Sequence, residues 1–423
     1  MNFLLRSGTY DHVVIFSGNP LSYGCPYTSR TTSDDSDLFF HPENYYIICA
    51  VYKHVLVTGG AGFIGSHTVD LLISKGYKVR ILDSLQRRVH PKGKPGYIPP
   101  EAEFILGDVS SPKDLYRSLR GVDAVFHMAA YQDYMPDFGH FIHTNTESTA
   151  LMFELILANR LPIKKIVFAS SQAVAGDGKW NCKNHGEFWA EPRPIEQLET
   201  GQWEIRCPTC KRECKNVLMT EDICRPITTY GISKYAVELL AQTLGKKYLI
   251  PTVCLRYTYV QGPRNSIYNA YSGILRVFAM RILNNKPPIL VEDGMGLRDY
   301  VNCADVARAN LIVLEDPRAN NEIFFVGGGK AYSAIEFART MLKVFNSKLE
   351  PQIPGIFRVG DTRSTVSDIS RLNKLGWIPK VSLEKSLAAY RDWLLTQGRI
   401  EDVSNEAMKN MIRQKVIRKV KNI

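Results

Sequence analysis

The side chains best placed for chemistry are Tyr230 and Lys234, which stand four residues apart, and Ser171, which precedes them. Residues 230–248 have helical spacing, so the tyrosine and the lysine lie on one face of a helix. A free tyrosine has a pKa of about 10 and is a poor base at neutral pH. A cation about 4 Å away contributes on the order of 4 kcal/mol, which is about three pKa units. We therefore predict that Lys234 lowers the pKa of Tyr230 so that Tyr230 can move a proton. The alternative is an ordinary amphipathic helix.

A glycine-rich loop, Thr58-Gly-Gly-Ala-Gly-Phe-Ile-Gly65, separates an apolar run from a helical pattern. Glycines at such a turn let the backbone approach a pyrophosphate, and the helix N-terminus that follows offers unpaired N–H groups. Asp83 ends the next apolar run, 18 residues after Gly65, where a carboxylate accepts ribose hydroxyls and repels a 2′-phosphate. The pattern predicts NAD as the cofactor, and the Arg87-Arg88 pair keeps NADP as the alternative. Because the positive nicotinamide of NAD would also lower the pKa of Tyr230, we predict redox chemistry.

The composition is typical of a folded globular protein: 423 residues, of which 45% are hydrophobic and 22% are charged. No run approaches the roughly 20 unbroken apolar residues of a membrane helix, and the N-terminus lacks the pattern of a secretory signal. We therefore expect a cytoplasmic protein without a membrane span. Much of the net charge of +11 lies in the C-terminal tail, and the rest suits an anionic diphosphate substrate. We expect no nucleic-acid partner, although a basic tail leaves membrane-surface or nucleic-acid contact open.

Short apolar runs alternate with longer helical patterns from residue 53 onward. The runs expected as strands are 55–57, 79–82, 104–106, 124–128 and 166–169, and helices are expected at 68–75 and 147–159. Alternation of this kind, with strands that are apolar throughout, indicates a parallel sheet covered on both faces. The prediction is an α/β fold, namely a Rossmann-type, doubly wound parallel sheet with right-handed crossovers.

Four parts are expected along the chain. Residues 1–52 form an N-terminal extension, poorly ordered or atypical, in which 45–51 could add a strand. Residues 53–260 form the NAD-binding domain, which a Cys-rich insertion at 177–223 interrupts. Residues 261–400 form a smaller C-terminal substrate lobe. Residues 401–423 form a basic amphipathic tail, with Met408, Ile412 and Val416 on one side of a helix.

The insertion carries two pairs of metal-ligand type, Cys182-x-x-His185 and Cys207-x-x-Cys210. Two such pairs can surround one tetrahedral zinc ion, which would organise a loop too small to bury a core of its own. We predict a structural zinc there, and the alternative is a set of reduced cysteines without metal. Clustering of five of the nine cysteines between Cys182 and Cys224 suits a reducing cytoplasm better than a disulfide framework.

Taken together, these features resemble the extended short-chain dehydrogenase/reductase family, specifically its NAD-dependent nucleotide-sugar epimerases and dehydratases, over roughly residues 53–398. The further motifs that carry the resemblance are Gly107-Asp-Val109, His127-Met-Ala-Ala130, Asn145, Ser170-Ser-Gln-Ala-Val-Ala-Gly176, Arg256-Tyr257, Gly262-Pro263, Arg298-Asp-Tyr-Val301, Arg358-Val-Gly-Asp361 and Leu375-Gly-Trp-Ile-Pro379.

The resemblance implies roles for individual positions. Ser171, Tyr230 and Lys234 would be catalytic. The substrate contacts that it implies are Ser171, Tyr259, Arg298 and Arg358, with the two arginines on the diphosphate. The cofactor contacts that it implies are Gly59, Gly62, Phe63, Ile64, Gly65, Asp83, Asp108, Val109, Ala129, Ala130, Tyr230 and Lys234.

Departures from the family pattern narrow the expected activity. Dehydratases of the family carry Asp-Glu after the catalytic hydroxyl, where this chain has Gln172 and Ala173, so 4-epimerisation is favoured over dehydration. The insertion and the segment 268–273 resemble most the epimerases that convert dTDP-L-rhamnose to dTDP-6-deoxy-L-talose. The alternatives are a UDP-hexose or UDP-uronate 4-epimerase, a nucleotide-sugar decarboxylase, or a non-catalytic NAD-binding regulator. The resemblance also implies a homodimer through the helices near 145–159 and 230–248.

Overall fold

A computed structural model of the protein describes residues 52–133, 135–268 and 273–421. The expected N-terminal extension, apart from Tyr52, and most of the segment 268–273 therefore lie outside the described residues. Within them, seven parallel strands form one sheet in the order β3-β2-β1-β4-β5-β9-β12. These strands are β1 (His54–Thr58), β2 (Lys78–Asp83), β3 (Glu103–Leu106), β4 (Ala124–His127), β5 (Lys165–Ser171), β9 (Thr252–Tyr257) and β12 (Glu322–Val326).

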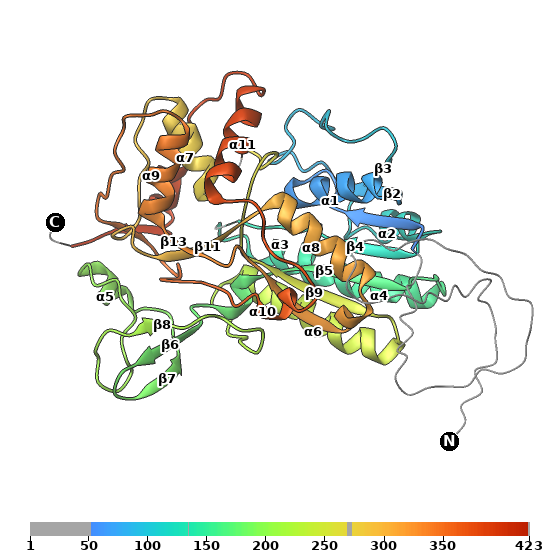
Figure 1. The fold of residues 1–423 in the computed structure, drawn as a ribbon, viewed down its shortest axis with the longest axis horizontal. Helices are drawn as coiled ribbons and strands as arrows, with labels where there is room; N and C mark the ends of the chain where they lie inside the picture. Colours follow the sequence, from blue (N-terminus) through green and yellow to red (C-terminus); the bar gives the residue numbers. More distant parts are fainter. Residues whose placement is uncertain (1–51, 134, 269–272, 422–423) are drawn as a thin grey trace, which may run out of the picture. The chain divides into compact units, whose positions relative to one another are not determined.

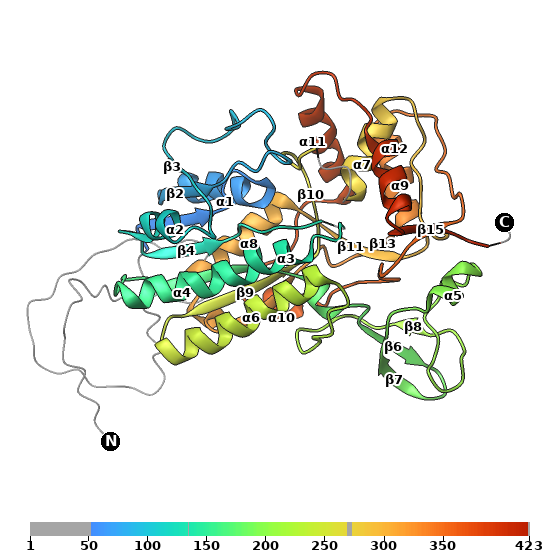
Figure 2. The same cartoon turned by 180° about the vertical axis from the view of Figure 1, so that it is seen from behind.

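Helices cover both faces of this sheet (Figures 1 and 2). One core contains sheet residues together with α1 (Phe63–Ser74) and α8 (Cys303–Glu315), which contact each other. The other core contains α2 (Pro112–Leu119), α4 (Ser148–Ala158) and α6 (Thr229–Tyr248). The strands β4, β5 and β9 are buried along their whole length, as expected for a sheet covered on both faces, whereas the edge strand β3 is partly exposed. The predicted α/β class, with a doubly wound parallel sheet, is confirmed, and each of the five predicted strands is present.

A second set of elements follows β9 and builds a separate core. Three short strands pair as β10-β11-β13, and Phe337, Leu387 and Tyr390 are fully buried among the helices beside them. The elements are β10 (Tyr259–Gln261), α7 (Ile274–Leu283), β11 (Leu297–Asn302), β13 (Ala331–Ser333), α9 (Ala334–Val344) and α11 (Leu383–Leu395). Short helical segments are α3 (Phe138–Phe141), η1 (Ile142–Glu147), η2 (Gln172–Ala175), η3 (Pro317–Ala319) and α10 (Ser370–Asn373).

The C-terminal tail packs against this second core. It forms helix α12 (Ser404–Arg413) and strand β15 (Ile417–Lys419), which pairs antiparallel with β14 (Ile356–Arg358). The predicted apolar side of the tail is met in part: Met408 and Val416 pack against the cluster that contains Met411, whereas Ile412 is 43% exposed. The turn into β15 accounts for the difference, since it directs Met411 and Ile417 into one small cluster with Ile356.

The insertion at 177–223, called here the inserted module, has a small sheet of its own, β7-β6-β8, apart from the main sheet (Figure 1). Its elements are β6 (Lys179–Cys182), β7 (Gly186–Trp189), α5 (Ile195–Glu199) and β8 (Lys215–Asn216). Its own apolar cluster contains Trp180, Ala190 and Ile205, with Phe188 and Cys214 packed beside them, while Met219 and Ile223 pack against Phe325 outside it. So small a core stabilises a fold only weakly.

Among the described helices, none is both long enough and apolar enough to cross a membrane.

Candidate active site

One cavity of about 1140 Å³ runs along the carboxyl edge of the main sheet and into the second core. Every residue expected to contact cofactor or substrate lines it, from Gly59 to Arg358. The four expected metal ligands lie elsewhere, in the inserted module. The structure therefore brings the predicted cofactor, catalytic and substrate positions together, and their chemical roles stay predictions.

The glycine loop is packed too tightly for side chains. A Cβ on Gly65 would lie 2.2 Å from the carbonyl oxygen of Gly59, and Gly59 itself has φ +69° with Ala129 N 2.8 Å from where its Cβ would be. Helix α1 begins after Gly62, and no side chain caps its N-terminus. Such a cradle leaves helix N–H groups facing the cavity, which is the arrangement that binds a pyrophosphate.

Asp83 closes the loop from the end of β2. Its carboxylate accepts hydrogen bonds from the backbone N–H groups of Ala61 at 2.9 Å and Leu85 at 2.8 Å. Burial raises the pKa of Asp83, against the lowering effect of these two hydrogen bonds. The NADP alternative rested on Arg87 and Arg88. Arg87 does not line the cavity, and Arg88 forms an ion pair with buried Asp133 and donates to the hydroxyl of Tyr131. Arg88 is therefore already engaged by this chain's own groups, which favours NAD.

A buried polar chain joins the glycine loop to the end of β4. Thr58 Oγ1 accepts from the N–H groups of Met128 and Ala129, both at 3.1 Å, and lies 3.0 Å from His127 Nδ1. His127 Nε2 lies 3.1 Å from Ser148 Oγ, whose own proton goes to the carbonyl of Thr144. Burial lowers the pKa of His127 to about 3, so the ring is neutral, and the network assigns its proton to Nε2. Ala129 is thereby fixed against Gly59.

Two sets of contacts hold the N-terminal end of α6, the helix that carries Tyr230 and Lys234. Gly231 permits a close approach, because a Cβ there would lie 2.5 Å from the carbonyl oxygen of Ala173, in the turn after Ser171. Asn145, in the π-helical segment η1, donates to Ser233 Oγ at 2.9 Å, and Ser233 Oγ donates to the carbonyl of Tyr230 at 2.8 Å. These contacts fix Tyr230 beside Ser171.

Hydrogen bonding with the hydroxyl of Ser171 lowers the pKa of Tyr230. Burial has the opposite and larger effect and raises the pKa of Tyr230 to about 12. The expected lowering of this pKa depended on Lys234 together with the positive nicotinamide of NAD, and it stays a prediction. Lys234 is buried and donates to the carbonyl of Ala169 at 2.8 Å. Burial lowers its pKa to about 8, which leaves it cationic at neutral pH.

The two arginines expected at the diphosphate share one carboxylate. Asp361 lies 3.7 Å from Arg298 and 3.5 Å from Arg358. Arg298 also donates to the carbonyl oxygens of Leu297, Thr362 and Arg363 at 2.8–2.9 Å, and its guanidinium lies over the ring of Tyr259 at 5.4 Å. Arg298 is held in a fixed orientation at the cavity wall.

Three charged residues near this wall were not found by sequence reasoning. Arg193 and Arg363 are buried, and each forms an ion pair with Glu292. Their partners are far away in the chain, so no spacing rule connects them. Arg363 stands five residues after Arg358, a proximity that could have drawn attention to it.

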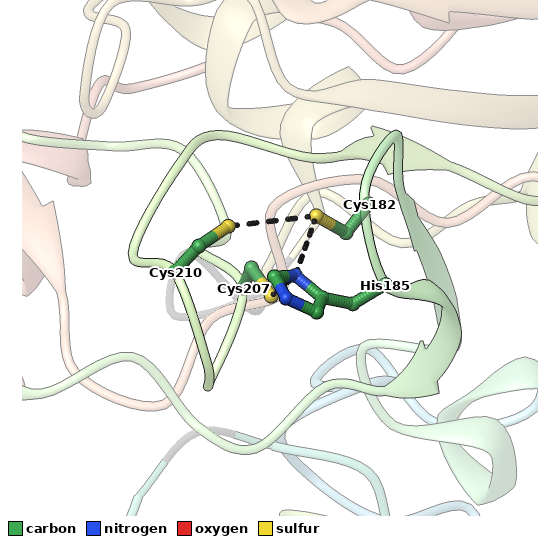
Figure 3. Close-up of side chains that lie close together, drawn as sticks. All are labelled: Cys182, His185, Cys207 and Cys210. Carbon is green, nitrogen blue, oxygen red and sulfur yellow. Dashed lines mark hydrogen bonds between the residues drawn. The ribbon is translucent and has the colours of Figure 1, made fainter.

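The expected metal ligands converge on one point in the inserted module (Figure 3). Cys182 Sγ lies 3.7 Å from Cys210 Sγ and 3.6 Å from His185 Nδ1, and Cys207 Sγ lies 3.5 Å from the same nitrogen. The β6–β7 hairpin supplies one pair and the turn at 207–210 supplies the other. All four ligand atoms lie within 4.8 Å of one another.

Comparison with known proteins gives consistent results. A dTDP-L-rhamnose 4-epimerase of Burkholderia thailandensis is 30% identical over 81% of this chain and 95% of its own length. A putative UDP-glucose 4-epimerase of Methanocaldococcus jannaschii is also 30% identical, over 82% of this chain and 99% of its own. The UDP-glucose 4-epimerase of Thermotoga maritima, solved with UDP-glucose, superposes with a TM-score of 0.66 at 28% identity, covering 82% of this chain and 100% of that one.

A second solved structure, the UDP-glucose 4-epimerase of Thermus thermophilus in complex with NAD, has a TM-score of 0.65 at 26% identity and covers 82% of this chain and 100% of that one. The sequence model of the NAD dependent epimerase/dehydratase family matches residues 55–196 and 211–327. The unmatched stretch between the two ranges falls inside the inserted module. The match spans more than half of the chain, which therefore belongs to the NAD dependent epimerase/dehydratase family.

Proposed function

We propose that this protein is an NAD-dependent nucleotide-sugar 4-epimerase, an isomerase. The observation that carries the proposal is the hydrogen-bonded Ser171–Tyr230 pair at the wall of a cavity that also contains the glycine cradle and two arginines. An NAD-binding regulator without activity would need neither the pair nor Lys234. The two residues directly after Ser171 are Gln172 and Ala173. Neither can act as an acid or a base, so the site lacks the pair that elimination of water would need.

NAD fits the residues at the carboxyl edge of the sheet. The cradle around Gly59 and Gly65 would hold the pyrophosphate, and Asp83 would accept the adenosine ribose hydroxyls. Ala129 and Lys234 would line the nicotinamide half. When bound, NAD supplies the acceptor and donor for the hydride of the sugar C4 carbon.

Tyr230 moves the proton of the C4 hydroxyl, and Ser171 holds the same oxygen in line. Burial of Tyr230 opposes its ionisation, so positive charge nearby must offset the cost of desolvation. Lys234 and the oxidised nicotinamide are the two positive charges available, and each acts strongly in a buried site. Ionisation of Tyr230 thereby depends on bound cofactor. Tyr230 becomes a base only when oxidised NAD is in place to accept the hydride.

Arg298 and Arg358 would hold the substrate diphosphate while the 4-keto sugar turns over within the cavity. Paired N–H groups of a guanidinium suit phosphate oxygens. A diphosphate would replace Asp361 as the anionic partner of these arginines. The fixed diphosphate serves as the pivot, so either face of C4 can be presented to the same hydride position.

For the substrate we propose dTDP-L-rhamnose, giving dTDP-6-deoxy-L-talose. The sequence relationship to the Burkholderia thailandensis enzyme and the inserted module support it. A UDP-hexose is the second candidate, because a putative UDP-glucose 4-epimerase is equally similar in sequence.

Zinc is the metal that we propose for the module. Zinc–sulfur bonds of about 2.3 Å and zinc–nitrogen bonds of about 2.0–2.1 Å in a tetrahedron separate two sulfurs by about 3.8 Å and sulfur from nitrogen by about 3.6 Å. Three of the separations among these ligand atoms, Cys182–His185, Cys182–Cys210 and Cys207–His185, are 3.5–3.7 Å, and all four atoms lie within 4.8 Å of one another. The role of the zinc would be structural, because protein side chains fill all four of its coordination positions and leave none open for a substrate or water. Thiolates of this kind persist in a reducing compartment, and we place the protein in the cytoplasm.

A homodimer through α4 and α6 completes the proposal. Three leucine or isoleucine side chains on these helices face outward: Leu157 is 37% exposed, Ile232 is 50% exposed and Leu239 is 52% exposed. Burying such side chains against a second copy would stabilise the pair of subunits by roughly 25 cal/mol per Å² of apolar surface.

The substrate proposal is tested by incubating the purified protein with dTDP-L-rhamnose, UDP-glucose, UDP-glucuronate and a GDP-hexose. Proton NMR reads the configuration at C4. We expect inversion of dTDP-L-rhamnose in preference to the UDP sugars. Preference for a UDP sugar would contradict dTDP-L-rhamnose as the substrate. If none of the four nucleotide sugars is turned over, the proposed activity is contradicted.

Replacing Tyr230 with phenylalanine removes the proton-transferring oxygen and little volume. We expect turnover to fall about 10²–10⁴-fold, with the amount of bound NAD unchanged when measured by absorbance after denaturation. Turnover near that of the unmodified protein would exclude Tyr230 as the base.

Elemental analysis of protein produced with ample zinc should find about one zinc per chain. Cys207→Ser should abolish stoichiometric zinc, whereas Cys214→Ser, in the same module but outside the four-ligand cluster, should retain it. Zinc-free unmodified protein, or loss of zinc from the Cys214 variant alone, would be incompatible with the site.

Light scattering should give twice the mass of one chain. Leu239→Glu should shift the protein to monomer, because it places charge in the proposed interface, while Leu395→Glu, at a 66% exposed position on α11, should not. A monomeric unmodified protein would rule out the dimer.

A further inference from the structure

The inserted module contacts the 357–368 segment, the stretch that carries Arg358 and Asp361. Backbone hydrogen bonds run in both directions: Met219 N–H donates to the carbonyl of Val366, and Asp368 N–H donates to the carbonyl of Met219, each at 2.8 Å. Asn216 donates to the carbonyl of Ser364 at 3.2 Å. The module is thus joined to the segment by regular pairing and not by a single contact.

Arg193 of the module is the central link. Its side chain is 2% exposed and forms an ion pair with Glu292 at 2.8 Å. The same guanidinium donates to the carbonyl of Trp203 inside the module at 2.8 Å, and to the carbonyl of Asp361 at 2.9 Å. One buried cation therefore fixes the backbone of Asp361 to the module. Arg193 does not line the cavity, so it cannot reach a substrate there itself.

A second link runs through Arg363. Its guanidinium donates to Glu204 of the module at 3.1 Å and to Asp293 at 2.7 and 2.9 Å. Its backbone N–H donates to Asp177, at the start of the module, at 2.7 Å. Glu204 stands three residues before Cys207, so the ligand turn and this ion pair belong to one short stretch of chain.

The segment held in this way orients both proposed diphosphate arginines. The carbonyl oxygens of Thr362 and Arg363 accept from Arg298, and the side chain of Asp361 faces Arg298 and Arg358 together. A displacement of the segment would move the acceptors that set the orientation of Arg298, and with them the strand end that carries Arg358. Misplacement by about 1 Å can cost on the order of 10²-fold in rate or binding.

We infer that the inserted module is a positioning element of the substrate site: through Arg193 and Glu204 it fixes the 357–368 segment, and thereby the grip of Arg298 and Arg358 on a nucleoside diphosphate. This inference rests on the proposed function, which places the diphosphate at those two arginines. Arg193 and Glu204 are positioning residues and touch neither cofactor nor substrate. Because Cys207 stands three residues after Glu204, the proposed zinc would help to hold Glu204 in place.

Binding of dTDP and of UDP, measured by isothermal titration calorimetry, tests the inference. Arg193→Met keeps the apolar stem and removes the three polar contacts. We expect its dissociation constant for the nucleoside diphosphate to rise at least tenfold and KM for the nucleotide sugar to rise in parallel. Turnover at saturation should change far less, and the NAD content should be unchanged, because the glycine cradle is remote from the segment. Arg193→Lys should recover part of the affinity.

Lys179→Met is the matched control, since Lys179 lies in the same module but pairs at 3.5 Å with Glu187 inside it. It should bind the nucleoside diphosphate as the unmodified protein does. Because Arg193→Met leaves buried Glu292 with one partner fewer, which destabilises the fold, Glu204→Gln is the second variant. Its side chain is 36% exposed, and we expect a several-fold rise in the dissociation constant.

The outcomes separate the two claims. Equal affinity in the unmodified, Arg193→Met and Glu204→Gln proteins would overturn the inference and leave the proposed function intact. Failure of the unmodified protein to bind either nucleoside diphosphate would instead contradict the proposed function. A parallel loss of NAD from Arg193→Met and Glu204→Gln would show a general structural role and would also overturn the inference.

Discussion

The carboxyl edge of the parallel sheet is the constraint on which the rest of the site depends. Parallel strands all have their carboxyl ends at the same edge of the sheet, so the segments that follow them lie close together there. The glycine cradle follows β1, Asp83 ends β2, and Ser171 ends β5. Ala129 follows β4 and is fixed to the cradle through Thr58 and neutral His127. One regular sheet thus places the proposed cofactor-binding and catalytic residues around one cavity.

Burial at that edge has an electrostatic consequence. The enclosed site raises the pKa of Tyr230 to about 12 and lowers that of Lys234 to about 8. Both shifts have the same cause, because desolvation disfavours the charged form of either group. The same low dielectric strengthens each interaction with a nearby charge. A site that opposes ionisation in the free protein is therefore one in which a bound cation has a large effect on the base.

Most of the sheet and the local motifs could be predicted from the sequence, because their determinants are close together in the chain. The glycine loop, the helix of Tyr230 and Lys234, and the two ligand pairs of the module each occupy a short stretch with fixed spacing. The exposure of Ile412 on the tail helix was not foreseen, because the position of this helix depends on the pairing of β15 with β14, a non-local contact. The links of Arg193 and Arg363 to the segment around Asp361 were not foreseen for the same reason. Only the fold brings these residues together.

The central claim is that the protein epimerises a nucleotide sugar by transient oxidation at C4 within one cavity. It is tested most directly with dTDP-L-rhamnose carrying deuterium at C4, with UDP-glucose labelled in the same way as the second substrate, in ordinary water. The account predicts an inverted product that retains deuterium at C4, because the hydride leaves and returns without meeting solvent. Inversion with deuterium replaced by solvent hydrogen, or no inversion of either sugar, would contradict it.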